Sequence, residues 1–197
     1  YDEWFAQRRE EVAQMVRGGA YAIVPDPQRP GQLADPWSVG EYVLQQEGAK
    51  PGMHAYYQIT RDGKPADGQN NSMMMGVVTF TGPAVYTDAE KFQKVEFADI
   101  QKGKAKFAAK ADNGWLAMVQ HYFVSAWLPT PGVAREFYMR KVGDDMYSAG
   151  VILPVSADGK SAVRLYAGPQ EQDKLEKIAP GLDLVVDYGW LTVIAAP

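Results

Sequence analysis

Short runs of hydrophobic residues, separated by turn-forming residues, follow one another from residue 41 to residue 168. Runs of this length, bounded by Gly, Pro, Asn and Asp, are typical of strands in an antiparallel sandwich or barrel. The predicted strands cover residues 56–60, 77–81, 95–97, 104–110, 115–128, 137–142, 147–155 and 163–167. The predicted turns lie at Asp62-Gly63, Gly82-Pro83, Asp88 to Glu90, Asn113-Gly114, Gly143-Asp144-Asp145 and Asp158-Gly159. The pattern therefore predicts a mainly β fold.

Two of these runs differ in how many faces of the predicted strand are buried. In residues 104–110, Ala105, Phe107 and Ala109 alternate with lysines, which predicts a strand with one face in water. In residues 115–128 both sets of alternating positions are largely apolar, as in a strand covered on both sides. One set comprises Trp115, Ala117, Val119, His121 and Phe123, and the other comprises Leu116, Met118, Tyr122 and Val124. We expect residues 115–128 to form one central strand.

Helical patterns flank the predicted sandwich. Phe5, Val12 and Val16 fall near one face of residues 1–17, and prolines between residues 25 and 36 forbid regular structure after them. Residues 170–179 place Leu175 and Ile178 on one side of a second helix, and Pro180-Gly181 ends it. The chain thus divides into an N-terminal helix and proline-rich linker (1–40), a β-sandwich (41–168), and a C-terminal helix with a further segment (169–197).

The last hydrophobic segment, LDLVVDYGWLTVI at 182–194, mixes aliphatic residues with Tyr188 and Trp190. These two ring types are enriched where a bilayer meets water. One interpretation is another sandwich strand with an aromatic end, and the other is a segment that lies at a membrane interface. Composition alone leaves both open.

Composition narrows the function classes. Hydrophobic residues make up 46% of the 197 residues and charged residues 22%, which is ordinary for a globular domain. The net charge of −4, with no basic run, argues against a nucleic acid partner. Absence of Cys excludes disulfides and thiolate metal sites. The longest apolar stretch, 115–128, is shorter than the about 18 residues of a membrane helix. Because the sequence opens at Tyr1 without Met or a signal-type stretch, we expect a piece of a longer protein.

Candidate catalytic chemistry is sparse. The two histidines, His54 and His121, have no partner at metal-ligand spacing, and no nucleophile elbow or phosphate loop occurs. His121 lies within an apolar run and is predicted to be a core residue, and Asp144-Asp145 is predicted to be a solvated turn. The methionines at 73–75 form adaptable apolar surface, with core filling as the main alternative. We predict no catalytic residue, no cofactor and no metal.

Three stretches of the chain resemble the periplasmic domain of the YidC family of bacterial membrane protein insertases. They are TFTGPAVYTDAEKFQKVEF at 79–97, GWLAMVQHYFVSAWLP at 114–129, and LYAGPQEQDKL at 165–175 continuing through IAPGLDLVVDYGW at 178–190. The likeness extends to YQITRDG at 57–63 and covers about residues 41–197. These runs occur in the family's order, which makes the resemblance specific.

The resemblance implies a twisted antiparallel β-supersandwich, similar to the galactose mutarotase-like fold, followed by a helix that leads to the membrane. It also implies a non-catalytic accessory module on the periplasmic face of the inner membrane, as part of a larger membrane-anchored protein. The implied partners are SecD/SecF of the Sec translocon, nascent membrane proteins, and the bilayer surface. The implied partner or membrane-proximal residues are Leu175, Ile178, Leu182, Leu184, Val185, Tyr188 and Trp190.

Residues 1–40 depart from the family, and the early strands that usually begin its sandwich are absent. We therefore expect helix 1–17 to pack on the sandwich and cover an exposed edge or apolar face. Two alternative functions stay open. A mutarotase-like enzyme or sugar-binding module would need a general acid and a general base, one of them His121. A stand-alone periplasmic chaperone would differ only in what lies beyond the two ends of this chain.

Overall fold

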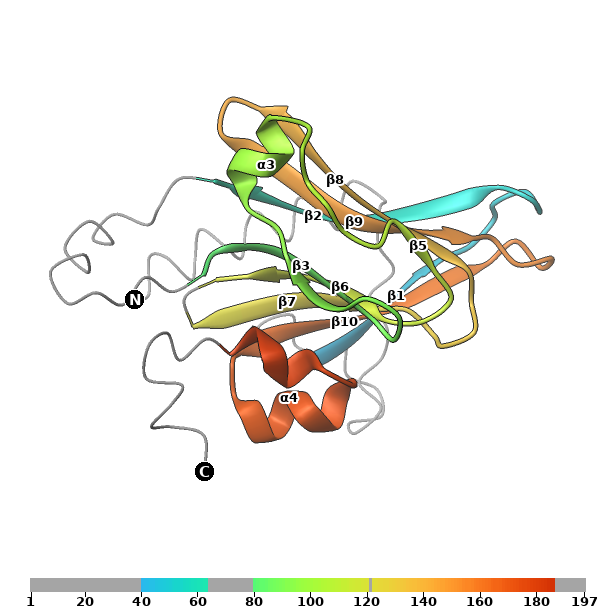
Figure 1. The fold of residues 1–197 in the computed structure, drawn as a ribbon. Coiled ribbons are helices and arrows are strands. Elements are labelled where there is room, and N and C mark those ends of the chain that lie inside the picture. Colours follow the sequence, from blue (N-terminus) through green and yellow to red (C-terminus); the bar gives the residue numbers. More distant parts are fainter. Residues whose placement is uncertain (1–39, 64–79, 121, 187–197) are drawn as a thin grey trace, which may run out of the picture.

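The computed structural model describes residues 40–63, 80–120 and 122–186, which form two stacked antiparallel sheets with short helices (Figure 1). The larger sheet has six strands in the order β1-β10-β7-β6-β3-β4. Their bounds are β1 Gly40–Gln46, β10 Ser161–Pro169, β7 Phe123–Leu128, β6 Trp115–Val119, β3 Gly82–Thr87 and β4 Lys91–Lys94. The mainly β prediction is confirmed for the part of the chain that is described.

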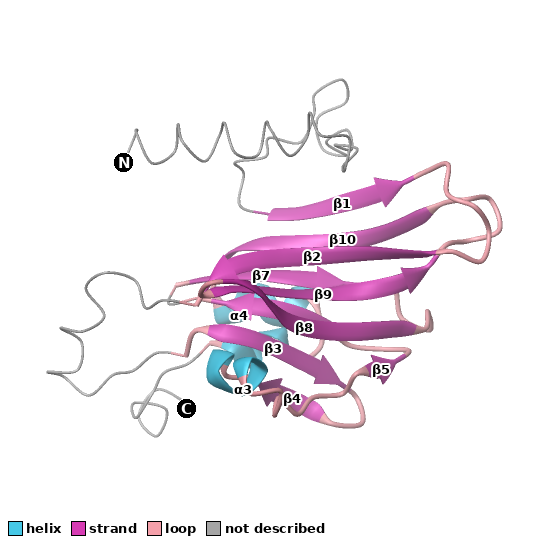
Figure 2. Ribbon diagram, turned by 90° about the horizontal axis from the view of Figure 1, so that it is seen from above, coloured by secondary structure: helices cyan, strands magenta, loops and turns pink. Residues whose placement is uncertain are grey.

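The second sheet has four strands in the order β2-β9-β8-β5 and lies over one face of the larger sheet (Figures 1 and 2). The bounds of its strands are β2 His54–Asp62, β9 Met146–Pro154, β8 Arg135–Gly143 and β5 Lys110–Ala111. Helix α3, Phe97–Gln101, lies at one end of this sheet, where the Phe97 and Tyr147 rings lie 4.6 Å apart. The predicted strands 56–60, 137–142 and 163–167 are confirmed within β2, β8 and β10, and the strand predicted at 147–155 is confirmed as β9 up to Pro154.

Alternation along the strands of the six-stranded sheet builds two separate cores. Leu116 and Met118 of β6 face the four-stranded sheet, where they join Trp127, Phe137 and Val151. The other face carries a second core, whose sheet residues include Trp115, Ala117, Val119, Val124, Ala126 and Tyr166. Because both faces are apolar, this sheet requires a cover on each side.

The expectation of one strand over residues 115–128 is wrong in one respect. β6 and β7 are two strands of a hairpin, paired from Leu116 with Trp127 to Val119 with Val124. The polar break in the sequence at Gln120 falls in the turn between them, and His121 lies outside the described residues. Since the turn resets the alternation, Val124 shares the face of Trp115 rather than that of Leu116.

Three further local predictions are corrected. Gly82 and Pro83 begin strand β3 rather than forming a turn; Pro83 precedes the first β3–β4 pair, and its carbonyl oxygen accepts from the Val95 N–H at 2.9 Å. The strand expected at 95–97 lies instead at Lys91–Lys94, and Phe97 begins α3. Of residues 104–110 only Lys110 enters a strand, although Phe107 does pack against the core and the lysines are exposed.

Several predictions fall on residues outside the described ranges. These are helix 1–17 and its packing on the sandwich, the linker at 25–36, most of the strand at 77–81, the methionines at 73–75, and Tyr188 and Trp190. Helix α4, Gln172–Ile178, confirms the C-terminal helix predicted at 170–179.

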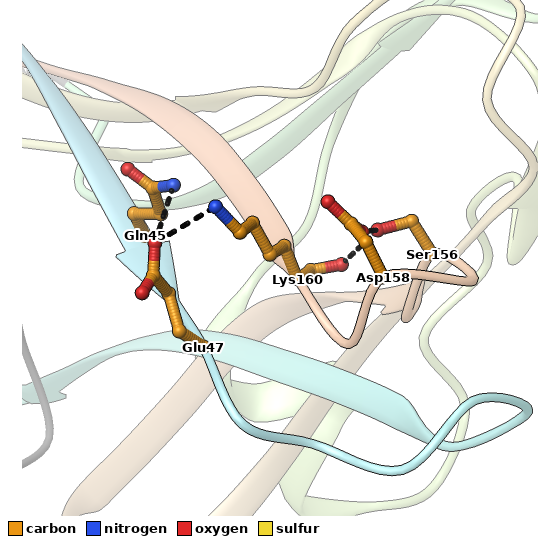
Figure 3. A network of polar contacts seen from close by, with 5 residues as sticks. All are labelled: Gln45, Glu47, Ser156, Asp158 and Lys160. Carbon is orange, nitrogen blue, oxygen red and sulfur yellow. Dashed lines mark hydrogen bonds and ion pairs between the residues drawn. The ribbon is translucent and has the colours of Figure 1, made fainter.

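Two connections between the sheets run beside each other, one from β1 to β2 and one from β9 to β10. The Ala49 N–H donates to the Gly159 carbonyl oxygen at 3.1 Å, and Lys160 Nζ lies 3.3 Å from Glu47 Oε1 (Figure 3). In the same turn the Ser156 hydroxyl donates to the Asp158 carboxylate, which lowers the pKa of Asp158. Gly159 has φ 78°, and a Cβ there would lie 2.6 Å from the Ala49 carbonyl oxygen, so the crossing requires glycine.

A buried arginine, Arg135, holds together the loop that follows β5 and the loop that follows β7. Arg135 is 3% exposed, and burial lowers the pKa of its guanidinium, which still stays charged at neutral pH. Its nitrogens donate only to backbone carbonyl oxygens, at 2.6 to 3.2 Å. The acceptors are the carbonyls of Asp112, Gly114, Pro129, Thr130 and Val133.

Replacing Arg135 by Lys tests this role. An ammonium group cannot reach the same set of carbonyls, so we expect Arg135→Lys to lower the free energy of unfolding by about 3 kcal/mol. The exposed Arg140→Lys is the matched control and should change it by less than about 0.5 kcal/mol. Urea unfolding followed by circular dichroism measures both, and equal effects of the two substitutions would show that Arg135 has no special role.

Candidate functional site

The C-terminal segment lies on the outer face of the six-stranded sheet, opposite the four-stranded sheet (Figure 1). It consists of helix α4 and the 3₁₀-helix η2, Leu182–Val185. Asp173 in the first turn of α4 and Lys177 in the last turn suit the helix dipole. Leu175 and Leu182 are fully buried and Val185 is 1% exposed, all within the outer core. This segment is therefore the cover that the outer face requires.

The corner between α4 and η2 is held against the sheet by an aromatic pair. The Trp115 indole N–H donates to the Pro180 carbonyl oxygen at 2.9 Å. The Tyr86 ring stacks on the Trp115 ring with 5.8 Å between centroids. Gly181 has φ 70°, and a Cβ there would lie 2.4 Å from the Tyr86 ring. The corner thus depends on a glycine for both its backbone conformation and its close approach.

The structure separates the predicted membrane-proximal residues into two groups. Leu175, Leu182 and Val185 are buried, and Ile178 is partly buried against the same core. Leu184 is 47% exposed. The strand interpretation of residues 182–194 is wrong for 182–185, which form η2. The buried members position the segment, and Leu184 is the one whose side chain is open to contact among those the structure describes.

A turn at one end of the sandwich carries two exposed aromatic residues that the sequence analysis placed inside a strand. Tyr122, in the turn between β6 and β7, is 69% exposed, and Phe123, the first residue of β7, is 52% exposed. Gln170, which precedes α4, holds this turn. Its N–H donates to the Tyr122 carbonyl oxygen at 2.9 Å, and its side-chain amide donates to the carbonyls of Gln120 and Phe123. The polar pair at 120–121 was the sequence signal for this turn.

The same end of the sheet is where several chain segments begin or end. The strand register places Gly40 beside Ala167, Pro169 beside Phe123, and Gly82 beside Val119. The first described residues of β1 and β3 therefore lie in one row with the aromatic turn. The described part of the C-terminal segment also ends at this side of the sandwich (Figures 1 and 2).

The remaining candidate groups are dispersed. His54 is exposed as the first residue of β2. Asp144 and Asp145 are exposed in the β8–β9 turn, as predicted. Glu136, 2.9 Å from Lys110 Nζ, raises the pKa of that lysine. Within residues 40–63, 80–120 and 122–186, no three His, Asp or Glu side chains gather as a metal site would require. Across the same ranges no helix combines the length and apolarity needed to cross a membrane.

Comparisons with known proteins agree with the sequence resemblance. The family model for the YidC periplasmic domain matches residues 38–197. The protein named membrane protein insertase YidC of Aromatoleum aromaticum is 70% identical over 149 residues, which are 73% of this chain and 26% of that protein. The proteins of the same name from Dechloromonas aromatica and Nitrosospira multiformis are 61% and 55% identical, over 27% and 25% of their lengths and 73% of this chain. The chain thus spans about a quarter of the length of these relatives.

Truncating one buried side chain of the C-terminal segment tests whether the segment belongs to the fold. Leu175→Ala leaves a cavity in the outer core, so we expect it to lower the free energy of unfolding by about 2–5 kcal/mol. The exposed Leu184→Ala should cost less than about 1 kcal/mol. Both values come from urea titration of the whole chain. A small effect of Leu175→Ala, similar to that of Leu184→Ala, would mean that the segment contributes little to the stability of the domain.

Proposed function

This chain belongs to the YidC periplasmic domain family, and from that premise we propose that it is the non-catalytic periplasmic part of a YidC-type membrane protein insertase. In this proposal it aids the insertion and folding of inner-membrane proteins. The observation that carries the proposal is the family match over residues 38–197, together with relatives of up to 70% identity named membrane protein insertase. The larger protein is anchored in the inner membrane, with this domain on the periplasmic side.

The proposal includes a specific fold for this domain. The fold is a β-supersandwich of the galactose mutarotase-like kind, which the two stacked antiparallel sheets support. Its parts are an N-terminal extension at 1–40, the sandwich at 41–168 and a membrane-proximal unit at 169–197. The burial of Leu175, Leu182 and Val185 supports this last part, because it ties the unit to the sandwich as one body.

The proposed partners are SecD/SecF and other Sec translocon components, nascent membrane proteins, and the bilayer surface. Leu184, with Tyr188 and Trp190 beyond the described residues, supplies the membrane-proximal contacts. The docked α4–η2 unit fixes the position at which the chain leaves the sandwich. A domain held in this way contributes to insertion by its placement relative to the membrane rather than by chemistry.

A mutarotase-like enzyme or sugar-binding module is the alternative from another class, and it rests on fold likeness alone. An enzyme of that kind needs an acid and a base in one cleft, and His121 would have to be one of them. A mutarotation assay of this chain and of His121→Ala separates the two functions, because the insertase proposal expects no activity in either. A stand-alone periplasmic chaperone is the third candidate, and it predicts that the native protein is recovered without membranes.

Two glycines of similar backbone conformation allow a matched test of the insertase proposal. Gly181 and Gly132 have φ values of 70° and 80°, but a Cβ at Gly132 would meet no atom within 4 Å. Gly181→Ala therefore displaces Tyr86 and the α4–η2 corner, whereas Gly132→Ala adds only the backbone cost. We expect Gly181→Ala, in the whole insertase, to lower membrane insertion of a reporter protein severalfold, with Gly132→Ala close to wild type.

The measurement is protease protection of the reporter in cells depleted of their own insertase, with the amount of each variant followed by immunoblot. Equal insertion by the two variants at equal protein levels would contradict a role for the docked C-terminal unit. Full insertion by an insertase that lacks residues 38–197 altogether would overturn the proposed function of the domain.

A further inference from the structure

We propose that the aromatic turn, Tyr122 and Phe123, is a lipid-docking surface that rests in the interfacial layer of the bilayer. The inference rests on the proposed function, because it assumes that the domain is held close to a membrane. Elsewhere among the described residues, large exposed hydrophobic side chains are spread over several elements: Val43, Met53, Tyr56, Val142 and Leu184. Among the large exposed hydrophobic residues that the structure describes, Tyr122 and Phe123 alone follow each other directly, and both are aromatic.

The size of the aromatic turn favours lipid over a folded protein partner. Two aromatic side chains bury about 150–250 Å² each, whereas a stable protein interface takes about 800 Å² from each partner. A contact this small suffices only for a domain that is already tethered near its target, since a tether raises the effective concentration. A membrane next to an attached domain meets that condition.

The chemistry of the turn suits the layer between headgroups and acyl chains. A phenol ring places its apolar part toward the acyl chains and its hydroxyl toward water, and Tyr is enriched at that depth for this reason. Gln120, Pro169 and Gln170, which meet the pair through backbone hydrogen bonds or strand register, are uncharged. His121, between Gln120 and Tyr122, lies outside the described residues. Insertion of the turn therefore desolvates no charge at these positions.

The turn is also held in place before any contact forms. The three hydrogen bonds from Gln170 fix the carbonyls of the turn, and the Gln120 N–H donates to the Phe123 carbonyl oxygen at 2.8 Å. A fixed turn loses little conformational freedom on docking. The described part of the C-terminal segment ends at the same side of the sandwich, so in this proposal the turn and that end face the membrane together (Figures 1 and 2).

Fluorescence quenching by labelled lipid tests the proposal on this chain. The chain has no Cys, so Tyr122→Cys introduces a single site for an environment-sensitive nitrobenzoxadiazole label. Tyr56→Cys is the matched control, because Tyr56 is 66% exposed on the four-stranded sheet. A C-terminal His-tag tethers each protein to phosphatidylethanolamine–phosphatidylglycerol vesicles that contain a nickel-chelating lipid, with or without a doxyl-labelled lipid.

We expect doxyl lipid to lower the emission at position 122 about twofold or more, with little change at position 56. Adding Phe123→Ser to the label at 122 should reduce the docked fraction by about tenfold, since it removes the aromatic ring that enters the lipid on docking. Equal quenching at the two positions, or quenching that Phe123→Ser leaves intact, would overturn the proposal.

These vesicles contain no translocon, so the result is independent of insertion activity. Absence of quenching at position 122, with normal insertion in cells, would overturn the lipid-docking proposal and leave the proposed function in place. Loss of insertion on deletion of residues 38–197, with no quenching at position 122, would support the proposed function and overturn the docking surface.

Discussion

The six-stranded sheet is apolar on both faces, and this one constraint determines the arrangement of the rest of the domain. β6 and β7 place Leu116 and Trp127 toward the four-stranded sheet and Trp115 and Val124 toward the other side. Burial of apolar surface is the main favourable contribution to folding, so each face needs its own cover. The second sheet covers one face, and α4 with η2 covers the other.

Covering the outer face with α4 and η2 makes these two helices part of the folded core. Leu175 and Leu182 have the same burial as the sheet residues beneath them, and the Trp115–Pro180 hydrogen bond fixes the corner between the helices. The segment next to the proposed membrane approach is thus part of the domain core.

Much of this fold could be predicted from the sequence, and the failures share a cause. Strands β2, β8, β9 and β10 and helix α4 follow from period and turn residues, which are local signals. Residues 115–128 were predicted as one strand because both faces are apolar, and periodicity alone does not reveal a hairpin within such a run. For that reason the exposed position of Tyr122 and Phe123 at the end of the hairpin was not predicted. Leu182 and Val185 are buried against a sheet whose strands are distant in sequence. Local sequence patterns therefore could not predict where their segment packs.

Native-state hydrogen exchange of the whole chain tests the central claim most directly, namely that the C-terminal segment folds as part of the sandwich core. The account predicts that the amide hydrogens of Leu175 and Leu182 exchange only on global unfolding, with opening free energies within about 1 kcal/mol of those of β6. Exchange of these two amides through a separate, much cheaper opening, while β6 stays protected, would contradict it.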